Sequence, residues 1–328
     1  MPDIITHYRF GVSVTQRLVP ELCASLRHEL YDSATAGPDL WFSYRFWRPK
    51  AQQGKPERGN IMQHEHTGAF LSALLDASRQ GEAKADFFSY LAGFLCHYCL
   101  DKAAHPYIIY RSGLYDGTEA TLSCRGDHMR MEHALDLLAV KAWGLRPWQR
   151  PITRRILRLR AMPPDMRPEL DAIYERVYGW SGAWNDLNLA LRDQRLFYRL
   201  AEDPTGLLDA ILRRVDNGAS GRDLTSISYH GKEQPQLDIA NEAKQPWQHP
   251  RDPRLISRES FAELSERAAN ETAELISLAW AYASGRTTTP PSFGNLSYET
   301  GFDCADPKND ASAQCDPLRF DKHQRTKG

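Results

Sequence analysis

The stretch GFLCHYCLDKAAHPYIIYRSG, residues 93–113, places three ionisable side chains in a segment that is otherwise mostly apolar. His97, Asp101 and His105 follow one another at intervals of four residues. On an α-helix each such step is a rotation of about 40° and a rise of about 6 Å, so the three side chains share one face. The two histidines then lie about 12 Å apart, too far to bind one zinc ion through bonds of about 2 Å. The spacing therefore predicts two metal positions on one stripe, with Asp101 between them.

A second stretch, HMRMEHALD at residues 128–136, offers ligands for one of these positions. His128 and Glu132 are four residues apart, a spacing that lets both side chains bind one ion. His105 would complete a three-ligand site, which leaves a position open for water or substrate. The neighbouring His133 points about 100° away on a helix, and we expect it to be structural.

Four more candidate ligands lie upstream. Asp39 stands in a turn, His64 and His66 precede an expected helix, and His7 is near the start of the chain. Surface or core packing explains any one of them. Taken with the stripe, they supply enough nitrogen and carboxylate ligands for three ions.

Length and composition set broad limits. A chain of 328 residues is long enough for one large or two ordinary domains. Its 41 Lys and Arg nearly balance its 42 Asp and Glu, so no overall field favours nucleic acid or acidic substrates. The first residues show no secretory signal, and no run is as long as a transmembrane helix. We therefore expect a cytoplasmic protein. The six cysteines are too sparse for a disulfide framework, and we expect Cys96 and Cys99 to be small buried residues.

Apolar periodicity predicts a chain dominated by helices. One of them should end at His105, because a residue before proline is biased away from helical geometry. Alternating strand patterns are missing, so the prediction is an all-α helical bundle. We expect one domain over residues 1–285 and a loop-rich tail over 286–328, with a further polar loop over 218–255. The predicted helices cover residues 12–31, 67–80, 84–105, 127–143, and about 167–180, 184–200, 204–216 and 258–284.

Several motifs together resemble the zinc-dependent phospholipase C family, whose fold is shared with the single-strand-specific zinc nucleases. The resemblance is dense over residues 1–136 and patchy beyond. FGNLSYETG at 293–301 is also similar to bacterial members of this group. The motifs are ITHY at 5–8, AGPD at 36–39, GNIMQHEHTG at 59–68, GFLCHYCLDKAAHPY at 93–107 and HMRMEHALD at 128–136.

The resemblance implies up to three zinc ions per chain. The ligands of the first would be Asp39, His64, His97 and one oxygen of Asp101, with His66 as the alternative to His64. Asp101 would bridge to the second ion, which His7 and the amino terminus also bind. The third would be held by His105, His128 and Glu132.

The amino-terminal ligand departs from the family pattern. In the family, processing exposes a tryptophan whose amine and carbonyl chelate zinc. This chain begins Met1-Pro2, so we expect Pro2 to supply the terminal amine if Met1 is removed. The alternative is that His7, Asp101 and water suffice.

The implied activity is that of a metal-dependent hydrolase of phosphodiesters. The leading interpretation is phospholipase C-type cleavage of a glycerophospholipid, with Asp101 bridging two metals and Asp39 as a general base. A nuclease-like or small-molecule phosphodiesterase on the same fold is the first alternative. The second is a non-catalytic, metal-stabilised helical protein that binds lipid or a partner.

Two segments bear on the substrate. Trp41, Phe42 and Tyr44 follow Asp39 closely, and such rings can enclose a choline ammonium group, stack nucleobases or pack in a core. In choline-selective relatives the residue after this aspartate is aromatic, whereas here it is Leu40. We interpret the arginine-rich segment 146–162 first as a solvated helix that packs one apolar stripe, with peripheral contact with an anionic membrane surface or a nucleic-acid backbone as the alternatives.

Overall fold

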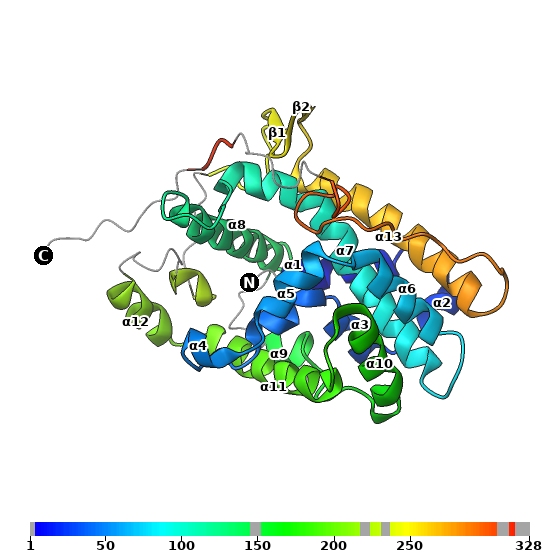
Figure 1. The fold of residues 1–328 in the computed structure, drawn as a ribbon. Helices are drawn as coiled ribbons and strands as arrows, with labels where there is room; N and C mark the ends of the chain where they lie inside the picture. Colours follow the sequence, from blue (N-terminus) through cyan, green and yellow to red (C-terminus); the bar gives the residue numbers. More distant parts are fainter. Residues whose placement is uncertain (1–3, 145–151, 217–223, 231–236, 307–314, 319–328) are drawn as a thin grey trace, which may run out of the picture.

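The computed structural model describes residues 4–144, 152–216, 224–230, 237–306 and 315–318. Within these ranges the chain is mostly α-helical, and its one named sheet has two strands (Figure 1). The prediction of a mainly helical protein is confirmed.

The helix α7 (Lys84–Ser112) lies at the centre of the bundle (Figure 1). Its sequence is apolar on most of its circumference, which is the pattern of a helix buried on all sides. The stripe of His97, Asp101 and His105 is therefore enclosed by neighbouring helices. Those that pack on α7 include α1 (Ile4–Thr15), α3 (His28–Ala34), α6 (Thr67–Ala77), α8 (Leu122–Lys141) and α13 (Phe261–Ala283).

The expectation that this helix ends at His105 is wrong, because α7 continues through Pro106 to Ser112. Proline has no N–H to donate to the carbonyl of Lys102, four residues earlier. A turn of the C-terminal segment closes on this point, where a Cβ on Gly301 would lie 2.9 Å from the Lys102 oxygen. Tertiary packing thus outweighs the local preference, and the helix ends only at Gly113, whose φ is 85°.

Other helix boundaries also differ from the predicted ones. The predicted helix over 12–31 is divided into the end of α1, α2 (Pro20–Ser25) and α3, because Pro20 begins a new helix in the position that suits proline. The helix predicted to start at Asp127 begins at Leu122. The later helices lie close to their predicted ranges, as α10 (Arg167–Tyr178), α11 (Ala183–Ala201), α12 (Leu207–Val215) and α13.

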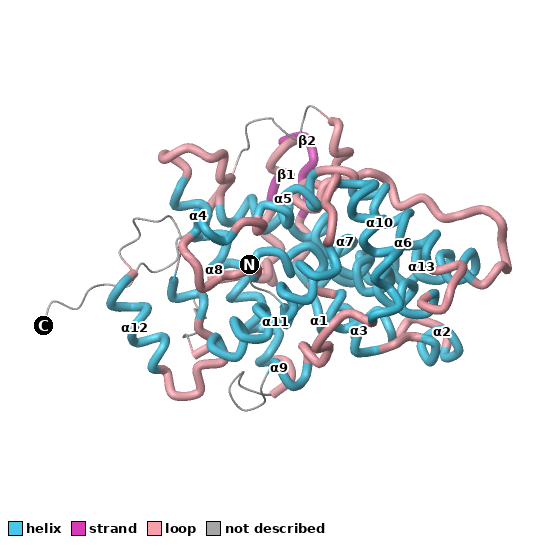
Figure 2. The backbone as a smooth tube through the Cα atoms, turned by 60° about the horizontal axis from the view of Figure 1, so that its bottom comes forward, coloured by secondary structure: helices cyan, strands magenta, loops and turns pink. Residues whose placement is uncertain are grey.

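Short elements connect these helices (Figure 2). The strands β1 (Trp247–His249) and β2 (Asp252–Ser257) pair antiparallel within the segment predicted as a polar loop. The remaining elements are η1 (Gly37–Ser43), α4 (Lys50–Gln53), α5 (Glu57–His64), α9 (Ile152–Arg155), η3 (Pro164–Met166) and η4 (Leu224–Ile227).

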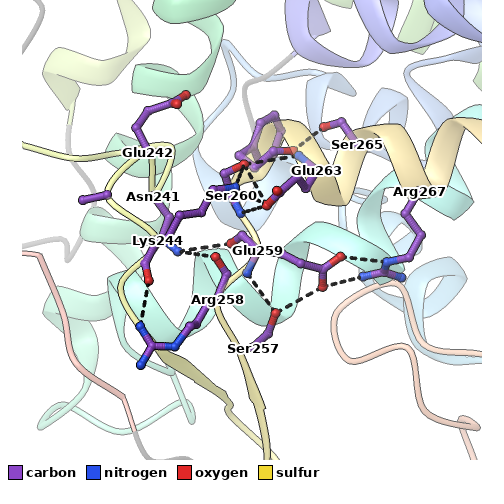
Figure 3. A network of polar contacts seen from close by, with 12 residues as sticks. Asn241, Glu242, Lys244, Ser257, Arg258, Glu259, Ser260, Glu263, Ser265 and Arg267 are labelled. Carbon is purple, nitrogen blue, oxygen red and sulfur yellow. Dashed lines mark hydrogen bonds and ion pairs between the residues drawn. The ribbon is translucent and has the colours of Figure 1, made fainter.

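The start of α13 is fixed by a polar network (Figure 3). The Ser260 hydroxyl accepts a hydrogen bond from the Glu263 N–H, and the Glu263 carboxylate accepts one from the Ser260 N–H. This capping box satisfies backbone donors that the first helical turn leaves open. Lys244 pairs with Glu263, and Arg267 Nε lies 3.0 Å from Glu259 Oε1. The network joins the loop before α13 to the helix that packs along α7.

Part of the predicted tail packs into the bundle. The Tyr98 hydroxyl donates to the Phe293 carbonyl at 2.7 Å. Gly68 opens α6 so close to the tail that a Cβ there would lie 1.6 Å from the Gly294 oxygen. Residues 293–301 thereby lie against α6 and α7, while the domain boundary at 285 stays a prediction.

Candidate metal centre

The first candidate metal site, the Asp101 group, consists of His7, His97 and Asp101, all buried. Asp101 Oδ1 lies 3.2 Å from His7 Nε2, and Asp101 Oδ2 lies 2.8 Å from His97 Nε2. The two imidazole rings are stacked, with centroids 4.0 Å apart. The carboxylate thus presents one oxygen to each ring.

The second site, the Glu132 group, consists of His105, His128 and Glu132. Glu132 Oε1 lies 3.3 Å from His105 Nε2 and 3.0 Å from His128 Nε2. The two groups are neighbours, since His105 Nδ1 is 3.8 Å from Asp101 Oδ2. As the four-residue spacing predicts, His97 and His105 belong to different groups on one stripe.

Backbone carbonyls orient both histidines of the stripe. His97 Nδ1 lies 3.0 Å from the Thr35 oxygen, and His105 Nδ1 lies 3.0 Å from the Tyr298 oxygen. A carbonyl only accepts hydrogen bonds, so each Nδ1 must carry the proton. In the neutral ring Nε2 then offers its lone pair to the group, which is the arrangement typical of metal-binding histidines.

This assignment supplies a test of whether a metal fits. His97 Nε2 and Asp101 Oδ2 approach to 2.8 Å, yet neither makes a contact with hydrogen-bond geometry to any described residue. Two lone pairs that converge in this way repel each other unless a cation lies between them. Imidazole nitrogen and carboxylate oxygen are ligands that zinc accepts. The donor set of the Asp101 group therefore fits a divalent metal.

The position of His7 is fixed by a carboxylate that belongs to neither group. Asp136, buried on α8, accepts hydrogen bonds from the Thr6 N–H at 2.8 Å and the Ile5 N–H at 3.3 Å. It also accepts one from the Tyr229 hydroxyl at 2.6 Å. These are N–H groups of the first turn of α1, which have no partner within the helix. Asp136 thus anchors the start of α1 and with it His7.

Mutual charge keeps the acids of the centre ionised. Burial alone would raise the pKa of Asp101, but the charges of His105, His97 and His7 hold that pKa well below its usual range. Burial likewise opposes ionisation of Glu132, whose pKa is held low by His128 and His105. Burial alone would lower the pKa of His105, but Asp101 and Glu132 raise it to about 10. These pKa shifts pair ionised carboxylates with protonated imidazoles. A cation bound by the Nε2 lone pairs would take the place of those protons.

Asp39 and His64, predicted as ligands of one zinc, lie beside the two groups rather than within them. Asp39 Oδ1 is 3.9 Å from His97 Nε2 and accepts a hydrogen bond from Gln63 Nε2 at 2.8 Å. Gly37 lets this turn approach α7, because a Cβ there would lie 2.4 Å from the His97 ring. His64 Nε2 lies 3.2 Å from Glu299 Oε2.

The alternative ligand His66 has a different environment. It precedes α6 with a left-handed φ of 54°, and its ring centroid is 6.2 Å from that of Tyr178. Of the two histidines, His64 is the one that contacts a carboxylate of the centre. Pro2 lies outside the described residues.

Glu299 is the residue of the centre that the sequence analysis missed. Besides its contact with His64, it is electrostatically coupled to His105 and His128. Burial would raise the pKa of Glu299, but His64, His105 and His128 lower it to about 2. The signal available was the motif FGNLSYETG, which marks the segment without singling out its glutamate.

The aromatic side chains after Asp39 are mostly core residues. Trp41 and Tyr44 are buried, and the Arg58 guanidinium lies 4.9 Å from the Trp41 ring centroid. Phe42 is half-buried beside Gly59. The packing that the sequence analysis gave as one option thus accounts for Trp41 and Tyr44.

The segment 146–162 lies partly outside the described residues. In the described part, Ile156 and Leu159 are buried in the protein, so neither offers an apolar face to a membrane. Contact through this segment stays a prediction. Cys96 and Cys99 are buried, as expected. Among the described residues, we find no helix with the length and apolarity needed to cross a bilayer.

Comparison with known proteins identifies no relative of this chain. No family model, curated protein or solved structure matches the chain. The resemblance to zinc-dependent phospholipases C therefore rests on the motifs and stays a prediction.

Proposed function

We propose that this chain is a zinc-dependent phosphodiester hydrolase of phospholipase C type, acting on a glycerophospholipid. The observation that carries the proposal is the pair of adjacent His and carboxylate groups on α7, joined through Asp101 and His105. Neighbouring metal positions of this kind suit the displacement of an oxygen from phosphorus.

The residues that would hold the metals are those of the Asp101 and Glu132 groups, with Asp39, His64 and the amino terminus as the further predicted ligands. Zinc bound there would supply a nucleophilic water near neutral pH and neutralise charge on the phosphoryl oxygens. Asp101 would hold the two imidazoles of its group at a fixed distance. Asp39, whose side chain is 24% exposed, would be the acid that meets a substrate or accepts a proton.

Burial of Trp41 and Tyr44 disfavours a nucleic-acid substrate, and it equally removes these two rings as a site for choline. Base stacking requires accessible rings. Trp41 and Tyr44 are buried, so they cannot serve as a stacking platform. The nearly balanced charge of the whole chain also gives no general attraction for a polyanion.

The test compares zinc-loaded protein on mixed phospholipid vesicles and on single-stranded DNA. We expect release of phosphorylated head groups from the vesicles and no cleavage of DNA. Asp101→Asn should lower the rate by more than about 100-fold, because loss of an outer-shell partner alone costs about 10–100-fold. Asp171→Asn, a half-buried aspartate on α10, is the matched control and should keep full activity.

Each other outcome has a defined meaning. Cleavage of DNA alone would assign the chain to the nuclease-like alternative. No turnover of either substrate by protein that binds zinc would favour the non-catalytic binding protein. Zinc content per chain, measured on the same samples, distinguishes occupation of two sites from the predicted three.

A further inference from the structure

The helix α12 turns one row of its apolar side chains outward, whereas Leu208 and Leu212 are half-buried. Leu207, Ile211 and Val215 follow one another at four-residue intervals and are 65%, 48% and 56% exposed. These three residues form the α12 face. None of the residues of this helix is buried, although its apolar and polar residues are sharply separated. A helix on a globular protein normally packs its apolar stripe on the core.

The orientation of α12 is fixed by its polar side. The Asp203 carboxylate accepts hydrogen bonds from the Leu208 N–H at 3.1 Å and the Asp209 N–H at 2.8 Å. Asp203 also accepts a hydrogen bond from the Ser228 hydroxyl at 2.9 Å, next to η4. Asp209 pairs with Arg213 at 2.7 Å, and the Asp209 side chain is only 14% exposed. The first turn of α12 is thus tied through Asp203 to the residue after η4, while the α12 face points to solvent.

The end of α11, which leads directly into α12, also exposes apolar side chains. Leu196 and Leu200 are four residues apart and 43% and 53% exposed. Trp47, 47% exposed, lies against the same helix, with its ring centroid 5.7 Å from the Arg192 guanidinium. Both views place α12 at the edge of the molecule (Figures 1 and 2).

The exposed charges of this region carry one sign. Between residues 192 and 215, the exposed charged side chains are Arg192, Arg199 and Arg214. The acidic side chains there are buried or half-buried: Asp193, Glu202, Asp203 and Asp209. An aliphatic face with cationic side chains next to it complements a surface that is anionic above and apolar beneath.

We propose that the α12 face and the end of α11 dock on the surface of an anionic phospholipid bilayer. The choice of a phospholipid partner rests on the proposed function, which it deepens. The leucine, isoleucine and valine side chains enter the boundary between head groups and acyl chains, and the arginines contact lipid phosphates. A nucleic acid would use the arginines but leave the aliphatic stripe in water.

Docking there would bring the bilayer near the metal centre. The helix α11 packs against η1, the element that carries Asp39. The Arg45 N–H at the end of this segment donates to the buried Asp193 carboxylate of α11 at 2.9 Å. The ring centroids of Phe46 and Phe197 are 5.3 Å apart. A direct packing contact therefore links the α11 part of the proposed docking surface to η1, the element that carries Asp39.

The test is co-sedimentation of the full chain with vesicles of phosphatidylcholine alone or with part of it replaced by phosphatidylserine. The Asp101→Asn chain is used beside the wild type, so that binding is scored without turnover. We expect association that increases with phosphatidylserine and decreases with salt. Ile211→Asp should weaken it at least about tenfold, and Arg199→Gln or Arg214→Gln about fivefold each. Leu278→Asp is the matched control, because Leu278 is 47% exposed on α13, a helix on the opposite side of the molecule from α12 (Figure 1).

Three results would overturn the proposal. They are no association of the wild-type chain, equal binding by Ile211→Asp and wild type, and an equal loss in Leu278→Asp. Self-association in sedimentation velocity that disappears in Ile211→Asp would assign the face to a second copy of this chain instead. Hydrolysis is measured separately, so vesicle binding without turnover would refute the proposed function and leave the docking surface standing.

Discussion

The candidate metal centre and the α12 face depart from the usual distribution of side chains in opposite directions. Asp101 is 3% exposed although it is charged, whereas Leu207 is 65% exposed although it is apolar. For Asp101 the compensation lies within the protein, because three histidines surround it. For Leu207 the described residues offer no apolar cover. The comparison teaches that a buried charge points to a ligand inside the fold and an exposed apolar face to a partner outside it.

The largest effect should come from two matched leucine substitutions that test this contrast. Leu187 on α11 is 1% exposed, and Leu187→Ala should lower the free energy of unfolding by about 2–5 kcal/mol through lost burial and a cavity. Leu207→Ala on α12 should change it by less than about 0.5 kcal/mol. Urea unfolding of both variants is the measurement. A similar loss in both would mean that the α12 face is packed in solution, and the comparison would fail.

The part of the metal centre that follows helical spacing could be predicted from the sequence. His97, Asp101 and His105, and likewise His128 and Glu132, share a helix face whatever the rest of the fold does. An error of several residues at a helix end did not matter, since α8 starts earlier than predicted and still carries both ligands on one face.

Contacts between elements could not be predicted in the same way. Glu299 and the Tyr298 carbonyl belong to a turn-rich segment. Its sequence has no periodicity from which the orientation of its side chains could be predicted. Where α7 continues through Pro106, Gly301 packs at the Lys102 carbonyl from about 200 residues further along the chain, a contact that no local pattern predicts. In the 146–162 segment, the burial of Ile156 and Leu159 agrees with the interpretation that the apolar residues pack, although α9 ends at Arg155. The sequence alone could not decide whether these residues face the protein or a membrane.

The next smaller effect tests what the buried carboxylate of Asp136 contributes to stability. Asp136→Asn should lower the free energy of unfolding by about 2–3 kcal/mol, because a neutral amide replaces a carboxylate that accepts from two backbone N–H groups and Tyr229. It should also weaken zinc binding in the Asp101 group, since His7 follows this anchor directly. Tyr229→Phe removes one donor only and should cost about 1 kcal/mol. Equal losses in the two variants would show that the anchoring of α1 is not what Asp136 contributes. Urea unfolding with and without zinc separates the two effects.

The smallest effect concerns Glu299, which tests whether the C-terminal segment belongs to the metal centre. Glu299→Gln keeps the shape of the side chain but removes the charge that faces His64, His105 and His128. Outer partners of metal ligands typically contribute about 10–100-fold, so we expect at least about tenfold weaker zinc binding or lower kcat/KM. Glu65→Gln is the control, because Glu65 is adjacent to His64 in the chain but exposed, and it should behave as wild type. If Glu299→Gln matches that control while His64→Ala loses zinc, His64 binds metal without its carboxylate partner. In that case residues 293–301 serve only to cover α7, and the charge compensation of the centre comes from the helices alone.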